Sequence, residues 1–324
     1  MLQNKIFNIS NNQQFETLAL EVFKYQFENN TIYNQFCVLL NRDPSNVDSL
    51  ENIPFLPIDL FKSRKLISGR SPVQITFTSS GTTGSTTSKH FVTDLRLYEE
   101  SFLKAFKLFY GEPGDYIFLA LLPSYLERKG SSLIYMADSL IKYSEDTNSG
   151  FYLDNLDELS KMLETLDKSG KKVFLIGVSF ALLDLVEKNK FSLKNTIVME
   201  TGGMKGRRKE MIREELHENL KKGFGVQEIH SEYGMTELLS QAYSKGQGVF
   251  DCPPWMKILI RDPEDALALL PKGKTGGINV IDLANINSCS FIATQDLGRQ
   301  INDQVEILGR FDNSDVRGCN LLLL

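Results

Sequence analysis

The segment TFTSSGTTGSTTSK, residues 76–89, joins a short apolar lead to a run of hydroxyl side chains that is interrupted by glycines and closed by Lys89. Glycines let backbone N–H groups approach a phosphate closely, hydroxyls donate hydrogen bonds to its oxygens, and a lysine adds a compact positive charge. A Ser/Thr-rich surface loop is the simpler alternative. The strand pattern before the segment and the lysine that closes it favour a cradle for a triphosphate.

The segment is not the common P-loop, because the spacing G-x-x-x-x-G-K-[ST] is absent from it. Gly273-Lys274-Thr275 does not supply that motif either, since Ala268 occupies the position of the required earlier glycine. A turn between strands explains Gly273 better.

A second segment, SEYGMTE at residues 231–237, follows a predicted strand at 226–230. Gly234 would permit a sharp bend there, which brings an aromatic, a hydroxyl and a carboxylate to one strand end. A carboxylate in that position can hold Mg²⁺, which bridges phosphates and offsets developing charge. Any one of these side chains alone would be interpreted as an ordinary surface residue, and only their combination is specific.

Composition places the chain among globular proteins: of 324 residues, 42% are hydrophobic and 24% charged, and the net charge is −5. The basic residues form no broad stripe, so we expect no nucleic-acid partner. The N-terminus lacks the pattern of a signal peptide and no apolar run is long enough for a membrane span, so we expect a cytoplasmic protein. The cysteines lie far apart in the sequence, which argues against a disulfide framework or a zinc site.

Strand and helix patterns alternate over most of the chain, which predicts an α/β fold with a largely parallel sheet layered with helices. Two domains are expected: residues 1–251, with a helical N-terminal segment at 14–41, and residues 252–324, a β-rich part with an antiparallel or barrel-like arrangement. The predicted strands are 73–78, 115–122, 172–177, 195–200, 226–230, 256–261, 277–283, 290–294 and 303–308. The predicted later helices are 95–109, 131–143, 155–167, 179–189 and 205–221.

TSSGTTGSTTSK and YGMTE resemble two signature motifs of the adenylate-forming superfamily, which includes acyl-CoA synthetases and luciferases. Further matches follow in order along the chain. Gly202-Gly203 resembles the adenine-binding turn, Asp296 the ribose-binding aspartate and GRFD at 309–312 the hinge motif. The resemblance implies the large N-terminal domain of that superfamily, with ATP and Mg²⁺ as cofactors.

FETLALEVFKYQ, IPFLPIDLFKS and the terminal RGCNLLLL resemble the acyl-protein synthetases, the LuxE-type fatty-acid ligases. That resemblance implies activation of a fatty acid as acyl-AMP, transfer of the acyl group to Cys319, and delivery to an acyl-reductase partner. Since the sequence stops at Leu324, we expect the C-terminal lid domain of the superfamily to be absent. Arg317 could lower the pKa of the Cys319 thiol.

The resemblance assigns roles to individual residues, all of them hypotheses. Lys89, Thr236, Glu237 and Cys319 are the expected catalytic residues, with Glu237 as the metal ligand. The expected nucleotide-binding residues are Ser79, Ser80, Gly81, Thr82, Thr83, Gly84, Gly202, Gly203, Tyr233, Gly234, Met235, Asp296 and Arg310.

Several alternatives stay open at the level of sequence. The chain could be a ligase that releases its adenylate to coenzyme A or an amine, or a nucleotide-binding scaffold without turnover. Cys319 could be a buried apolar residue, as we expect Cys37, Cys252 and Cys289 to be. His90 and His230 are interpreted as structural. The acyl chain length and the oligomeric state are not encoded in any pattern that we identify.

Overall fold

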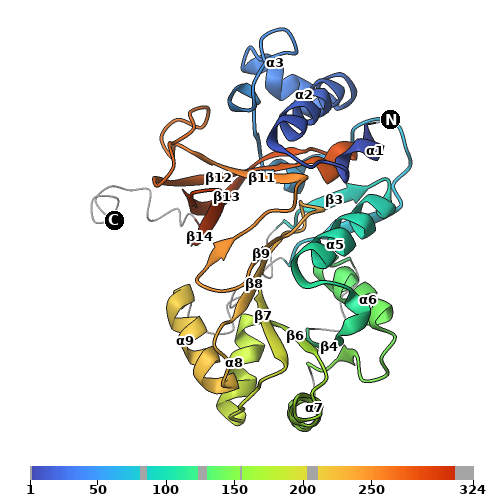
Figure 1. The fold of residues 1–324 in the computed structure, drawn as a ribbon. Coiled ribbons are helices and arrows are strands. Elements are labelled where there is room, and N and C mark those ends of the chain that lie inside the picture. Colours follow the sequence, from blue (N-terminus) through green and yellow to red (C-terminus); the bar gives the residue numbers. More distant parts are fainter. Residues whose placement is uncertain (1, 81–85, 123–129, 154, 203–210, 311–324) are drawn as a thin grey trace. The chain divides into compact units, whose positions relative to one another are not determined.

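The computed structural model describes residues 2–80, 86–122, 130–153, 155–202 and 211–310. The chain forms two compact units, which are described separately (Figure 1). The central unit is Pro72–Pro253, and the terminal unit combines Met1–Ser71 with Pro254–Leu324. The domain division expected from the sequence, residues 1–251 and 252–324, stays a prediction.

The central unit is built on a sheet in the strand order β5-β4-β6-β7-β8-β9. Its strands from β5 to β8 pair in parallel, and β9 is antiparallel to β8. The central strands β4 and β6 are buried along their whole length, as expected for a sheet covered on both faces. The bounds are β4 Ile117–Leu121, β5 Gly150–Phe151, β6 Val173–Val178, β7 Thr196–Thr201, β8 His230–Tyr233 and β9 Ala242–Ser244, with β10 Val249–Phe250 beside β9.

Helices cover both faces of this sheet, with α5 and α6 on one side and α8 and α9 on the other (Figure 1). Helix α9 can approach α8 closely because Gly223 has no side chain: a Cβ there would lie 2.3 Å from the Cβ of Val186. The predicted helix at 205–221 begins at Arg213 among the residues described. The bounds are α5 Leu95–Tyr110, α6 Ser132–Ser144, α7 Leu156–Lys168, α8 Ser179–Lys188 and α9 Arg213–Phe224, with a 3₁₀ turn η2 at Pro113–Asp115.

Strand β8 begins later than the sequence pattern predicted, at His230 rather than at residue 226. Gly225, in the left-handed region with φ +70°, ends α9, and the chain then has to cross to the sheet. Pairing begins where β7 offers a partner, with Met199 opposite His230. As a result, Ser231 to Tyr233 of the second motif lie inside the strand and not beyond its end.

The terminal unit contains an antiparallel run of strands in the order β11-β12-β13-β14, which confirms the expected antiparallel tail. The short strand β1 pairs in parallel with β13. The strands are β1 Leu56–Pro57, β11 Met256–Arg261, β12 Thr275–Asp282, β13 Phe291–Ile301 and β14 Gln304–Arg310. The helices are α1 Gln3–Ile6, α2 Asn12–Asn29, α3 Thr31–Leu39 and α4 Leu60–Ser63, with 3₁₀ turns η1 Leu50–Asn52 and η3 Leu283–Asn287.

One buried amide links helix α2 to the segment between β12 and β13. Gln26 of α2 is fully buried, and its side-chain amide nitrogen, Nε2, donates to the carbonyl oxygens of Asn285 and Ile286 at 3.0 Å each. Its Oε1 accepts from the backbone N–H of Ser290 at 2.9 Å. The rings of Tyr33 of α3 and Phe291 of β13 stack with centroids 5.8 Å apart. These long-range contacts leave no periodic trace in the sequence.

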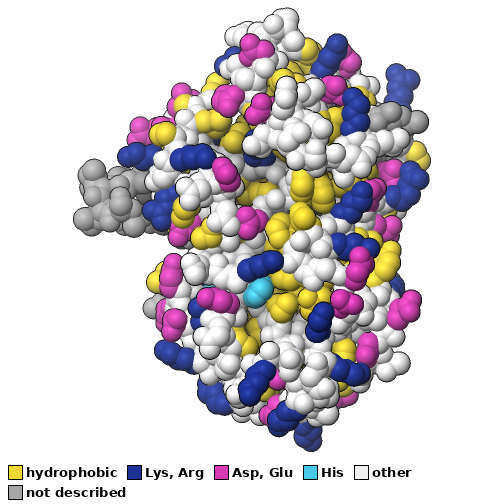
Figure 2. All heavy atoms as spheres, in the orientation of Figure 1, with side chains coloured by type: hydrophobic (Ala, Val, Ile, Leu, Met, Phe, Trp, Pro, Cys, Tyr) yellow, Lys and Arg dark blue, Asp and Glu magenta, His cyan; other side chains and the backbone are white. Residues whose placement is uncertain are grey.

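Charged side chains of both signs are interspersed over the face of the molecule drawn in Figure 2. Within the described ranges, no helix has the length and apolar character that a membrane span requires.

Replacing Gln26 by leucine should lower the free energy of unfolding by about 2 kcal/mol, because the buried carbonyl and N–H partners of its amide would lose their hydrogen bonds. Urea unfolding followed by circular dichroism measures the change. Gln13→Leu, on the exposed side of the same helix, is the matched control and should have almost no effect. Equal midpoints for both variants would contradict the anchoring role of Gln26.

Candidate nucleotide site

The described ends of the hydroxyl-rich segment belong to a β-hairpin in the central unit. Strands β2 (Ile75–Thr78) and β3 (Lys89–Val92) pair antiparallel, with Thr78 opposite Lys89. Ser79 closes the loop: its N–H donates to the Ser88 carbonyl at 3.1 Å, and its Oγ accepts from the Ser88 N–H at 3.0 Å. Ser80 and Lys89 are exposed next to this closure. The predicted phosphate ligands Gly81, Thr82, Thr83 and Gly84 lie outside the described residues.

The parallel pairing of β7 and β8 brings two further predicted segments to the same edge of the sheet. Gly202 directly follows β7 in the left-handed region, φ +66°, where its carbonyl accepts from Ser179 Oγ at 2.6 Å. Tyr233 ends β8, and the following turn is closed by a bond from the Leu238 N–H to the Met235 carbonyl at 3.1 Å. Gly203 lies outside the described residues. Strand ends of a parallel sheet are where ligands bind most often.

Gly234 lies against a side chain that the sequence analysis did not consider. An added Cβ at Gly234 would lie 2.2 Å from Oε1 of Glu232, so the glycine makes room for that carboxyl group. Glu232 accepts a short hydrogen bond from the Thr201 hydroxyl of β7. Burial raises the pKa of Glu232 to about 7, the hydrogen bond from Thr201 acts in the opposite direction, and the charge of Glu200 adds to the rise. The sequence analysis had assigned no role to Glu232.

Thr236 and Glu237 follow this turn, Thr236 half-buried and Glu237 buried at 6% exposure. The Thr236 carbonyl is bonded to Nδ1 of His90 at 3.0 Å. His90 is the residue after Lys89 in β3, so this bond joins the hairpin that carries the first motif to the turn that carries the second. Residues about 146 positions apart in the sequence are thereby brought together.

A serine of β8, a histidine of α9 and a glutamate of β7 also meet, but not as a hydrolytic triad. Ser231 Oγ and Glu200 Oε1 approach the same ring nitrogen of His217, Nε2, at 3.4 and 3.6 Å. A catalytic histidine uses its two nitrogens separately, one for the nucleophile and one for the carboxylate. Ser231 is also fully buried. This cluster therefore links β7 and β8 to α9 and does not offer a nucleophile.

Glu200 remains ionised in this buried setting. Burial by itself would raise the pKa of its carboxyl group. The hydrogen bond from His217, the charge of Arg213 and the hydrogen bond from Ser231 together outweigh that effect, so the pKa is lowered. Ser179 Oγ lies 3.1 Å from its Oε2.

The two predicted ribose ligands are neighbours in the terminal unit. Asp296 of β13 pairs with Arg310 of β14, and Arg310 Nε lies 3.6 Å from Asp296 Oδ1. The Asp296 N–H donates to Thr294 Oγ1 at 3.1 Å. The Arg310 side chain is 83% exposed and that of Asp296 only 14%. Their roles towards a nucleotide stay predictions.

Two of the described cysteines, Cys37 and Cys289, are poor nucleophiles because the pKa of each thiol is raised. Burial raises the pKa of the Cys37 and Cys289 thiols to about 12, so little thiolate forms at neutral pH. Cys252 is half-buried. The predicted acyl carrier, Cys319, lies outside the described residues.

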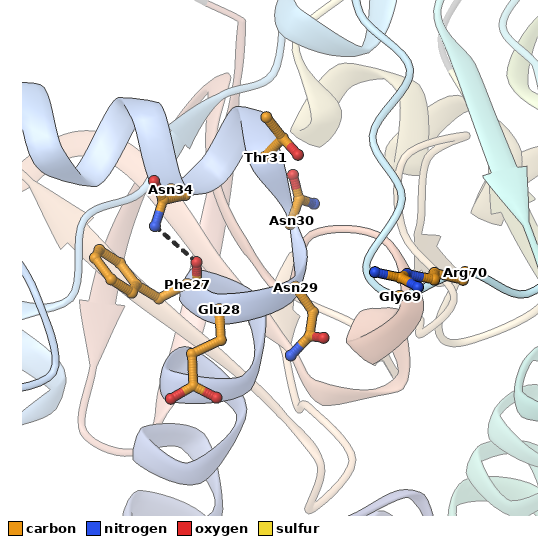
Figure 3. Close-up of a pocket in the computed structure, with 8 residues that line it drawn as sticks. All are labelled: Phe27, Glu28, Asn29, Asn30, Thr31, Asn34, Gly69 and Arg70. Carbon is orange, nitrogen blue, oxygen red and sulfur yellow. Dashed lines mark hydrogen bonds between the residues drawn. The ribbon is translucent and has the colours of Figure 1, made fainter.

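A cavity of about 550 Å³ opens in the terminal unit, at the corner between α2 and α3 (Figure 3). Asn34 Nδ2 donates to the Phe27 carbonyl across its wall at 2.9 Å. None of the predicted site residues that the structure describes lines it, and its polar wall does not suit a fatty acyl chain, which needs apolar side chains. The lining residues are Phe27, Glu28, Asn29, Asn30, Thr31, Asn34, Gly69 and Arg70.

Solved structures of adenylate-forming ligases share this fold. ATP-bound MatB from Rhodopseudomonas palustris matches with a TM-score of 0.55 at 17% identity over 75% of this chain, which spans about half of that protein, 49%. A 2-hydroxyisobutyryl-CoA ligase in complex with 2-HIB-AMP and CoA matches with a TM-score of 0.65 at 13% identity, over 94% of this chain and 72% of the other. These likenesses confirm the expected fold class.

Sequence comparison identifies the family. A curated relative from Vibrio harveyi, a long-chain-fatty-acid–luciferin-component ligase, is 25% identical over 94% of this chain and 85% of its own length. The family model of the acyl-protein synthetases, LuxE, matches residues 1–107 and 124–324. Because that match covers most of the sequence and agrees with the fold and with both motifs, the chain belongs to the LuxE family of acyl-protein synthetases.

Proposed function

We propose that this protein uses ATP to activate a long-chain fatty acid, forming acyl-AMP and pyrophosphate, and then transfers the acyl group to a protein thiol. The observation that carries the proposal is the bond between His90 and Thr236, which joins the hairpin of the first motif to the turn of the second. Family membership and the fold of the adenylate-forming ligases support it. A cytoplasmic location, where ATP is plentiful, agrees with this reaction.

The first half-reaction needs charge compensation and not a general base. A fatty acid with a pKa of about 4 is already ionised at neutral pH, so its carboxylate oxygen can attack the α-phosphorus directly. The bond from that phosphorus to the pyrophosphate oxygen breaks as the new bond forms. In this proposal Lys89 and the hydroxyls of Ser79 and Ser80 hold the β- and γ-phosphates, and Thr236 contacts the α-phosphate.

Glu237 suits a magnesium ion that is shared with the nucleotide. Mg²⁺ prefers oxygen ligands and is usually held by one or two carboxylates together with substrate phosphates. Within the part of the chain that the structure describes, no cluster of three or more His, Cys, Asp or Glu residues could form a complete protein cage. A bound Mg²⁺ would offset the negative charge of the phosphates, and Glu237 would hold it at the strand end.

Gly202, Gly203 and Tyr233 would surround the adenine in this scheme, and Gly234 and Met235 would also contact the nucleotide. Asp296 and Arg310 would hold the ribose hydroxyls, since a carboxylate accepts and a guanidinium donates hydrogen bonds.

In the second half-reaction the Cys319 thiolate would attack the carbonyl carbon of acyl-AMP. The carbon–sulfur bond forms, AMP leaves with the electron pair of the broken bond to its phosphate oxygen, and a thioester results. An acyl reductase would then receive the acyl group. This partner and the role of Cys319 come from the family resemblance.

Exchange of labelled pyrophosphate into ATP tests the first half-reaction, with a panel of fatty, aryl and amino acids. We expect exchange with long-chain fatty acids and its loss when the metal is chelated. Glu237→Gln should reduce exchange about 100-fold. Glu218→Gln, an exposed carboxylate on α9, should leave it unchanged. Full exchange in Glu237→Gln would rule out the metal assignment, and ATP binding without any exchange would favour a scaffold.

Intact-mass spectrometry tests the second half-reaction. After incubation with ATP and myristate, the protein mass should rise by one acyl group, and hydroxylamine should remove it, as expected of a thioester. Cys319→Ser should abolish the adduct while pyrophosphate exchange continues. Cys252→Ser is the matched control and should keep it. An adduct that persists in Cys319→Ser would exclude this residue as the acceptor.

A further inference from the structure

His90 occupies an unusual place for a residue outside both motifs. It lies in β3 directly after Lys89, is 1% exposed, and forms a hydrogen bond with a main-chain group of Thr236. Side chains alternate along a strand, so His90 points into the unit while Lys89, on the opposite side, is exposed. Strand β3 therefore carries an exposed cation, Lys89, and a buried residue that is bonded to the second motif, His90, at consecutive positions.

The direction of the bond fixes the state of the imidazole. The Thr236 carbonyl oxygen can only accept, so Nδ1 of His90 must carry the proton. Burial lowers the pKa of His90 to about 4, although the bond to Thr236 acts in the opposite direction. At neutral pH the ring is therefore neutral with its proton on Nδ1, and the bond is maintained without a buried charge.

Both partners of this bond are firmly held. On the hairpin side, Phe77 lies opposite His90 in the register and packs edge-to-face on Tyr98 with ring centroids 5.2 Å apart. The next residue, Thr78, donates its N–H to the Gly130 carbonyl at 2.7 Å. On the other side, Ser240, just beyond the second motif, is bonded to Ser101 of α5 at 3.0 Å. A bond between two anchored elements fixes their separation.

We propose that His90 is a positioning residue that sets the distance between Lys89 and the Thr236–Glu237 pair, so that both address the same triphosphate. This inference rests on the proposed function. Its physical basis is that phosphoryl and adenylyl transfer depend on placement, and a displacement of about 1 Å can cost about 100-fold in rate. His90 itself need not touch the nucleotide.

Substitutions at His90 can separate this role from simple core packing. Asparagine places an amide N–H close to the position of Nδ1, whereas glutamine extends its N–H towards the position of Nε2, and leucine has no donor. We expect His90→Asn to retain pyrophosphate exchange within about threefold and His90→Leu to lose about 100-fold in kcat. His90→Gln should resemble leucine. The KM for the fatty acid should change little in any of them.

Tyr98→Phe is the control for stability. It removes one buried hydrogen bond, from the Tyr98 hydroxyl to the Ser132 carbonyl at 2.8 Å, behind the same hairpin. Its unfolding midpoint should fall about as far as that of His90→Leu, but its exchange rate should remain at the wild-type level. If His90→Leu does not fold, the comparison of asparagine with glutamine decides the question.

The outcomes are distinguishable. Exchange at the wild-type rate in His90→Leu, or equal losses in His90→Asn and His90→Gln, would overturn the positioning role and leave the proposed function intact. If exchange rates fell in proportion to stability, with Tyr98→Phe losing as much exchange activity as His90→Leu, the positioning role would also be overturned. Absence of exchange in the wild-type protein would overturn the proposed function and this inference together.

Discussion

Parallel pairing of β7 with β8, from Met199 opposite His230 to Thr201 opposite Glu232, brings two strand ends to one edge of the central sheet. The chain segments beyond those ends carry Gly202 and the turn from Gly234 to Glu237. The hairpin of β2 and β3 is tied to that turn by His90. If the register of β7 and β8 were shifted by one residue, Thr201 and Glu232 would face opposite sides of the sheet and their hydrogen bond could not form.

This arrangement has an energetic cost, because two carboxyl groups on neighbouring strands, Glu200 of β7 and Glu232 of β8, interact: the charge of Glu200 adds to the rise in the pKa of Glu232. The negative charge of Glu200 is stabilised by His217, Arg213 and Ser231. Glu232 accepts a hydrogen bond from the Thr201 hydroxyl, and its pKa is raised. A buried polar group without a partner costs about 1–3 kcal/mol, so the supporting hydroxyl and imidazole groups contribute to the stability of the fold. Several residues outside the signature motifs thus determine where the motifs lie.

Local patterns predicted the elements of this protein well where one element could be recognised by itself. The amphipathic helix expected at 95–109 is α5, Leu95–Tyr110, and the strand expected at 256–261 is β11, Met256–Arg261. The pattern was wrong at 226–230, because the start of β8 depends on where β7 provides a partner. The grouping of the first 71 residues with the tail depends on contacts such as that of Gln26 with residues 285–290.

The chemistry and the family were determined by the sequence alone, because glycines, hydroxyls, a lysine and a carboxylate at fixed spacings are recognisable without knowing what surrounds them. The predicted roles of Gly81 to Gly84 and of Cys319 still rest on that resemblance. Only the tertiary structure decided that Gly234 accommodates the Glu232 carboxyl group, that Ser231 and His217 form a supporting cluster, and that His90 joins the two motifs. Each of these depends on side chains that meet across distant parts of the chain, and hydrophobic periodicity encodes which face of an element is buried but not which residue it will meet there.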